Sequence, residues 1–156
     1  MHKIRVSTNI RAPKETVWRV MLDDATYRRW SSVFHEGSYA VTDWKEGSKA
    51  LFLTPERNGM LSKIVVNRPK EFLSIMHQGI VKNGEELRET DEAKQWAGAL
   101  ENYTLRDTGG DSILTIEMEV TDEYKKYFEE TWPKALQKLK EIAEAASSRN
   151  RTRLSA

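Results

Sequence analysis

The chain has 156 residues, a formal net charge of +1 and no cysteine. This length suits one domain that buries a core without covalent or metal staples, and the lack of cysteine excludes disulfides, zinc–thiolate sites and thiol nucleophiles. Because Arg149, Arg151 and Arg153 carry three of the positive charges, the rest of the chain is slightly negative, which argues against a nucleic-acid partner.

The sequence also argues against a membrane protein and the common enzyme classes. No run of about 18 apolar residues occurs, and the first residues enter a polar–apolar alternation directly. We therefore predict a cytoplasmic protein without integral membrane association. We predict no metal and no cofactor, because His2, His35 and His77 form no short ligand spacing and no nucleotide-binding or nucleophile motif occurs.

The first predicted elements are a strand and two short helices. Apolar or β-branched residues alternate with polar ones over residues 3–11, which predicts a half-buried strand. Pro13 has the fixed φ of a first helical turn, and the apolar residues that follow at helical spacing predict a helix ending near Asp23. A second short helix is predicted over residues 25–31.

The middle of the chain has the punctuation of antiparallel hairpins. Breaks that contain Gly or Asn separate β-rich runs between residues 37 and 120. Residues 79–95 lack a clear period and carry several acidic residues, which indicates a solvated loop that could hold one helical turn and serve as a flap. The predicted strands are residues 38–44, 49–54, 59–67, 71–78, 96–106 and 112–120.

One long amphipathic helix is predicted over residues 122–146. The carboxylate of Asp122 interacts favourably with the positive N-terminal end of this helix. Pro133 lies within the helix and is expected to bend it. Residues 147–156 lack periodicity and are predicted to be a disordered polar tail, so the domain spans residues 1–146. The apolar stripe of the helix consists of Phe128, Trp132, Leu136, Leu139, Ile142 and Ala146.

This order of elements predicts an α+β fold. Parallel strands would need repeated crossover helices, which the order does not provide. A curved antiparallel sheet of six to seven strands wrapped around the long C-terminal helix, with two short helices after the first strand closing one end, satisfies the pattern. A cavity remains wherever helix and sheet do not meet, and such cavities are common ligand sites.

Several motifs resemble those of the START-like, or SRPBCC, superfamily, which has the helix-grip fold of the birch pollen allergen. The similarity covers about residues 3–146, and the most similar branch contains homologues of the activator of the 90-kDa heat-shock protein ATPase. The motifs are the run Ile10 to Trp18 with its Ala12-Pro13 pair, Tyr27-Arg28-Arg29-Trp30, Pro69, Tyr103-Thr104-Leu105, the Gly109-Gly110 hairpin and the closing helix.

The resemblance implies a domain that holds a small hydrophobic or amphipathic ligand, such as a lipid, polyketide or flavonoid, between the sheet and the C-terminal helix. A minority of the superfamily cyclise or dehydrate polyketides, and the chaperone activators form a further group. The chain has one domain, without the additional chaperone-docking domain of the eukaryotic activators, so a chaperone partner is disfavoured. A homodimer is left open.

Two positions could orient a ligand. His77 shares a strand face with Ile75, so on a concave sheet its imidazole would meet a ligand carbonyl or phenol; the alternative is a hydrogen-bonded core or rim histidine. Glu101 shares a face with Tyr103 and Leu105, and inside a cavity its carboxylate would need a partner; the alternative is a salt bridge at the rim.

Aromatic and methionine side chains complete the predicted pocket, because rings supply apolar area and thioethers line adaptable pockets. Core filling is the alternative for each of them. Trp30, Phe34, Trp44 and Trp96 are less periodic and nearer loops, and some of these four could surround the entrance. The predicted ligand-binding residues are His77, Ile75, Glu101, Tyr103, Met60, Phe52, Met118, Phe128, Trp132 and Trp30.

Three functional hypotheses follow. The leading one is a non-enzymatic carrier or sensor of a small apolar ligand with one or two polar groups, and no catalytic residue is assigned. The second is a polyketide cyclase- or dehydratase-like enzyme in which Glu101 or His77 is the general base and Tyr103 donates to an enolate. The third is a partner-binding module that resembles a chaperone ATPase activator.

Overall fold

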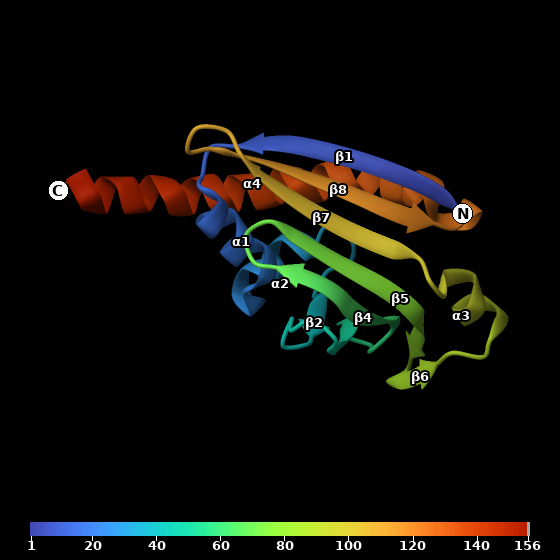
Figure 1. The fold of residues 1–156 in the computed structure, drawn as a ribbon. Helices are drawn as coiled ribbons and strands as arrows, with labels where there is room; N and C mark the ends of the chain where they lie inside the picture. Colours follow the sequence, from blue (N-terminus) through green and yellow to red (C-terminus); the bar gives the residue numbers. More distant parts are fainter. Residues whose placement is uncertain (156) are drawn as a thin grey trace.

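The computed structural model describes the backbone of residues 1–155 and the side chains of residues 1–148. A strand and two helices come first, followed by strands with one short helix among them, and a long helix closes the chain (Figure 1). The elements are β1 (His2–Ile10), α1 (Lys14–Leu22), α2 (Asp24–Ser31), β2 (Tyr39–Val41), β3 (Lys49–Leu53), β4 (Gly59–Arg68), β5 (Phe72–Lys82), β6 (Glu85–Leu87), α3 (Asp91–Trp96), β7 (Leu100–Asp107), β8 (Ser112–Val120), a 3₁₀ turn η1 (Asp122–Tyr124) and α4 (Lys125–Ser155).

The described strands form one antiparallel sheet. Its order is β1-β8-β7-β5-β4-β3-β2, and β6 pairs with β5 outside this path. The first and last strands of the chain are neighbours, in register from His2↔Val120 to Ile10↔Ser112. The predicted α+β helix-grip fold is therefore confirmed; the sheet has eight strands instead of six to seven, because β6 was not predicted.

The long helix covers the sheet, as predicted. Figure 1 shows α4 (red) running along one side of the strands, with α1 and α2 below it at one end. The predicted stripe on α4 faces inward: Trp132 and Leu139 are buried. The alternate residues of β8 that face α4 are buried too, from Leu114 to Val120, so the core lies between the helix and the concave face of the sheet.

Two segments differ from their predicted structure. Residues 79–95 hold the end of β5, a turn at Asn83, the strand β6 and most of the helix α3, where a loop that could hold one helical turn was expected. The helix α4 continues past residue 146 to Ser155, with Pro133 inside it. The side chains of residues 149–156 and the backbone of Ala156 lie outside the described residues, so the predicted disorder of the tail stays a prediction.

Candidate functional site

A cavity of about 640 Å³ lies between α2, α4 and the concave face of the sheet. Six of its lining residues come from α2 and the loop after it, and four of these six are at positions 27, 30, 31 and 34. This i, i+3, i+4, i+7 spacing places them on one face of a helical segment. The volume falls within the roughly 300–1,000 Å³ range of small-molecule pockets.

Aromatic rings form most of the cavity wall. The ring of Trp132 lies 4.9 Å from that of Phe34, 6.1 Å from that of Trp30 and 6.0 Å from that of Tyr103. Tyr27 packs edge-on against Trp30, at 5.0 Å between ring centroids. Such pairs hold the rings in fixed orientations, so the wall is a preformed apolar surface.

A group of polar side chains interrupts this wall at the inner end of the cavity. The Tyr103 hydroxyl donates a hydrogen bond to Glu101 Oε2. His77 Nε2 lies 3.5 Å from Glu101 Oε1, yet it has no hydrogen-bond partner among the described residues. The distance suits an electrostatic contact and exceeds that of a well-formed hydrogen bond. Because the His77 side chain is only 3% exposed, its Nε2 is a buried polar atom left unsatisfied.

Pairing between strands brings His77 and Glu101 together. Ile75 on β5 is in register with Glu101 on β7, and His77 lies opposite Ser62 on β4. A β-bulge between Leu61 and Ser62 interrupts the β4–β5 register at this point. Bulges re-aim side chains and are common beside functional sites, and here the Ser62 hydroxyl lies 2.7 Å from His77 Nδ1.

Two residues of α2 extend the polar group. Burial raises the pKa of the Tyr27 phenol, and the nearby Glu101 carboxylate raises it further. The pKa of Tyr103 is also well above its ordinary value, chiefly because of burial and next because of Glu101. Ser31 is buried, and its hydrogen bond with the Tyr27 phenol opposes the rise in the pKa of Tyr27 to a smaller extent. Both phenols therefore remain neutral hydrogen-bonding groups at ordinary pH.

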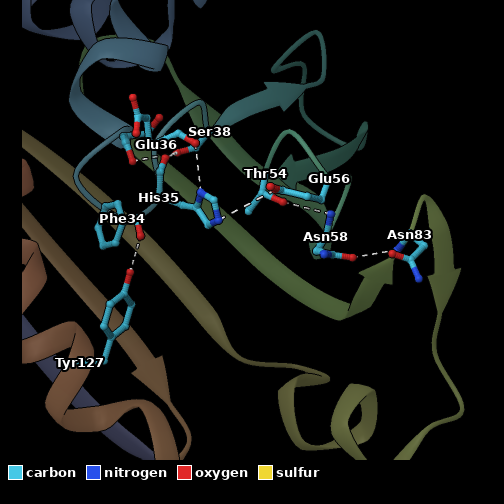
Figure 2. Close-up of polar contacts among 10 residues, drawn as sticks. Phe34, His35, Glu36, Ser38, Thr54, Glu56, Asn58, Asn83 and Tyr127 are labelled. Carbon is cyan, nitrogen blue, oxygen red and sulfur yellow. Dashed lines mark hydrogen bonds and ion pairs between the residues drawn. The ribbon is translucent and has the colours of Figure 1, made fainter.

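The mouth of the cavity has a polar rim. Figure 2 shows the His35 imidazole between the loop after α2 and the β3–β4 turn. Its Nδ1 contacts the Glu36 carbonyl at 3.0 Å, and its Nε2 lies 4.0 Å from Glu56 Oε2. On the other side of the loop, the Tyr127 hydroxyl donates a 2.7 Å hydrogen bond to the Phe34 carbonyl. The rim thus joins α4 to the loop that covers the entrance.

Removing the Tyr127 hydroxyl is expected to loosen this entrance. A hydrogen bond of this type contributes about 1 kcal/mol, so Tyr127→Phe should speed the release of a bound apolar dye roughly fivefold. Stopped-flow fluorescence measures the release rate. Tyr124→Phe is the matched control, because Tyr124 also lines the cavity but the structure shows no hydrogen bond from its hydroxyl to the loop. Equal rates in both variants would contradict the role of the Tyr127 bond.

The structure brings most of the predicted pocket residues together. Ile75 is buried in the core and does not line the cavity. Of the predicted entrance residues, Phe34 and Trp96 line the cavity, whereas Trp44 packs behind it against Tyr27 and Phe52. Whether the lining residues bind a ligand stays a prediction. The predicted residues that line the cavity are His77, Glu101, Tyr103, Met60, Phe52, Met118, Phe128, Trp132 and Trp30.

Sequence reasoning missed part of the lining. Tyr27 and Ser31 were not predicted, although their spacing with Trp30 and Phe34 on one helical face was a usable signal. Ile80 lies in the segment interpreted as a loop, so its inward position depends on the unexpected continuation of β5.

The fold and cavity define a helix-grip protein with an internal chamber. The model of the family described as Activator of Hsp90 ATPase homolog 1-like protein matches residues 11–144. The chain therefore belongs to this family. No protein with a curated description matches it.

Solved structures with a similar fold come from several bacteria. Protein MLL2253 from Mesorhizobium loti is 15% identical, with 92% of this chain and 98% of that chain covered and a TM-score of 0.71. CalU16 from Micromonospora echinospora is 20% identical, with 88% and 71% covered and a TM-score of 0.60. The Aha1 dimer from Colwellia psychrerythraea is 14% identical, with 92% and 97% covered and a TM-score of 0.61. At these identities the similarity shows the fold alone.

Among the described residues, no helix has the length and apolar character needed to cross a bilayer.

Proposed function

We propose that this protein is a cytoplasmic carrier or sensor that binds a small, largely apolar ligand in the cavity between the sheet and α4. The observation that carries the proposal is a buried polar atom on the wall of an aromatic chamber, His77 Nε2, which has no hydrogen-bond partner among the described residues. Buried polar groups without partners are costly. A ligand with a polar group would satisfy such atoms while its apolar body covers the rings.

The rim and the chamber fit an amphipathic molecule, such as a lipid, polyketide or flavonoid. Exposed polar residues at the entrance, among them Asn58, Lys82 and Asn83, line the same cavity as the buried rings. A ligand with an apolar body and polar ends would match both environments.

Native mass spectrometry of freshly purified protein, followed by titration with fatty acids and flavonoids, tests this proposal. We expect a copurified molecule, or saturable uptake with one ligand per chain. Met60→Trp adds bulk to a cavity-lining position and should block uptake. Lys63→Trp, at an exposed position of the same strand, is the matched control and should leave uptake unchanged. A well-folded protein that takes up none of these ligands would overturn the proposal.

An enzymatic function is the second candidate, because His77, Glu101 and Tyr103 line one cavity. Glu101 would take a proton from a carbon between two carbonyl groups of a polyketide, and Tyr103 would donate a hydrogen bond to the resulting enolate. Incubation with a poly-β-keto thioester should then yield a cyclised or dehydrated product, and Glu101→Gln should abolish its formation. Recovery of bound but unchanged substrate would exclude this candidate.

Two partners are also proposed, a second copy of this chain and a chaperone. A homodimer is proposed because one similar structure is that of a dimer; light scattering should give twice the chain mass. The family description refers to activation of a chaperone ATPase, so the ATPase rate of that chaperone should be measured with and without this protein. An unchanged rate would remove the chaperone as a partner.

A further inference from the structure

The inner end of the cavity presents one hydrogen-bond donor and one acceptor side by side. The donor follows from the contact between Ser62 and His77. Ser62 is fully buried, and its hydroxyl has one hydrogen-bond partner among the described residues, His77 Nδ1 at 2.7 Å. If the His77 ring is neutral, Nδ1 accepts the hydrogen bond from the Ser62 hydroxyl. The single ring hydrogen is then on Nε2. With a protonated ring, both nitrogens carry hydrogen. His77 Nε2 is a donor in both cases.

The acceptor is the second oxygen of Glu101. Its Oε2 receives the hydrogen bond from Tyr103, and Oε1 lies 3.5 Å from His77 Nε2. The Glu101 side chain is 14% exposed and lines the cavity. Oε1 is therefore an acceptor that receives no hydrogen bond from the described side chains.

One chemical group satisfies both atoms at a single point. A hydroxyl accepts from Nε2–H and donates to Oε1. An ether or carbonyl oxygen only accepts, so it would leave Oε1 without a donor. A protonated amine has no lone pair that could accept from Nε2–H, and a carboxylate would place a second negative charge beside Glu101.

The surroundings of the two atoms suit an aromatic body. The Trp96 ring lies edge-on to the His77 ring at 5.9 Å, and the Tyr103 ring is edge-on to that of Trp132 at 6.0 Å. A flat ring that carries the hydroxyl would contact these faces and edges. We infer that the ligand is an aromatic molecule with a free hydroxyl group, held between His77 Nε2 and Glu101 Oε1. This inference rests on the proposed ligand-binding function.

Three naphthalene probes test the inference by calorimetric titration of the full chain at neutral pH. They share one apolar body and differ in their polar group: 2-naphthol, 2-methoxynaphthalene and 2-naphthoate. A pair of hydrogen bonds that includes a charged acceptor should make 2-naphthol bind about tenfold or more tightly than the methoxy compound. The naphthoate should bind more weakly than the naphthol.

Variants test whether Glu101 is responsible for the preference for naphthol. Glu101→Leu should remove the preference for naphthol over methoxynaphthalene while methoxynaphthalene still binds. Glu117→Leu is the matched control. Glu117 lies on the neighbouring strand β8 and forms a half-exposed ion pair with Arg5, so this variant should keep the preference. Glu101→Gln removes the charge with little change in shape, so the naphthoate penalty should shrink even if Glu101→Leu folds poorly.

The outcomes separate this inference from the proposed function. Equal affinity of wild-type protein for all three probes would overturn the hydroxyl selection and leave the proposed function intact. A preference for naphthol that persists in Glu101→Leu would also overturn the assignment to Glu101. Binding of none of the probes, together with no uptake of lipids or flavonoids, would overturn both.

Discussion

Replacing Trp132 with alanine is expected to lower the free energy of unfolding by about 3–5 kcal/mol, the usual loss for a buried large aromatic residue. Trp132 is 2% exposed and lies within ring contact of Trp30, Phe34 and Tyr103. Its indole Nε1 also donates to the Met118 sulfur at 3.3 Å. The substitution therefore separates α4 from α2 and from the sheet at one point. Guanidinium unfolding followed by far-UV circular dichroism measures the loss.

Two variants distinguish this contact from a general effect of losing a tryptophan. Trp18→Ala changes a half-buried residue on α1 outside the cavity and should cost clearly less. Trp132→Phe keeps an aromatic ring and should recover much of the lost stability. A Trp132→Ala protein that is no less stable than Trp18→Ala would contradict the role of Trp132 as the central contact of the wall.

The fold could be predicted because its main elements have uninterrupted periodicity. Residues 3–11 and 114–120 alternate without a break, and they lie in the paired strands β1 and β8. The stripe of α4 is continuous through Trp132 and Leu139, and both are buried. Such long periodic segments fix which face is apolar, so their packing partner follows with little ambiguity.

Residues 79–95 could not be predicted in the same way, because close backbone packing decides their structure. A Cβ at Gly79 would lie 2.3 Å from the Leu87 carbonyl oxygen, so β6 can approach β5 only where β5 carries a glycine. Because this segment carries many charged side chains, it lacks the polar–apolar alternation that predicts a strand. The start of α3 did carry a signal, because the Thr90 hydroxyl caps the helix by accepting a hydrogen bond from the Ala93 amide at 3.1 Å.

Many lining residues of the candidate site could be predicted one by one from the sequence, but the contacts between them could not. Strand alternation placed His77 on the same face as Ile75 and Glu101 on the same face as Tyr103, yet the proximity of His77 and Glu101 depends on β5 pairing with β7, two strands that are not consecutive in the chain. The bulge at Ser62 that brings a hydroxyl to His77 Nδ1 has no periodic signature. Tyr27 was interpreted as part of a fold motif, although its ring also lines the cavity.

Between pH 10 and 11.5, the wild-type protein is expected to lose stability steeply because of Tyr27 and Tyr103, the two tyrosines whose pKa is raised by both burial and Glu101. Burial and the Glu101 carboxylate raise the pKa of Tyr103 and of Tyr27 above the ordinary value of 10.0. Below pH 10 both phenols are protonated in the folded and unfolded states, so the full stability is present. Above it the unfolded chain releases these protons while the folded chain keeps them, and each tyrosine lowers the free energy of unfolding by about 1.4 kcal/mol per pH unit.

Denaturant unfolding at several alkaline pH values, compared between wild type, Tyr103→Phe and Tyr27→Phe, measures this dependence. Each variant should have a slope shallower than that of the wild type by about 1.4 kcal/mol per pH unit, whatever its stability at neutral pH. Absorbance at the phenolate band gives an independent reading. Of the five tyrosines, Tyr27 and Tyr103 should ionise only when the protein unfolds, whereas all five should titrate near their ordinary value in denaturant. A Tyr103→Phe protein that loses stability as steeply as the wild type would show that the Tyr103 phenol is not held neutral beside Glu101.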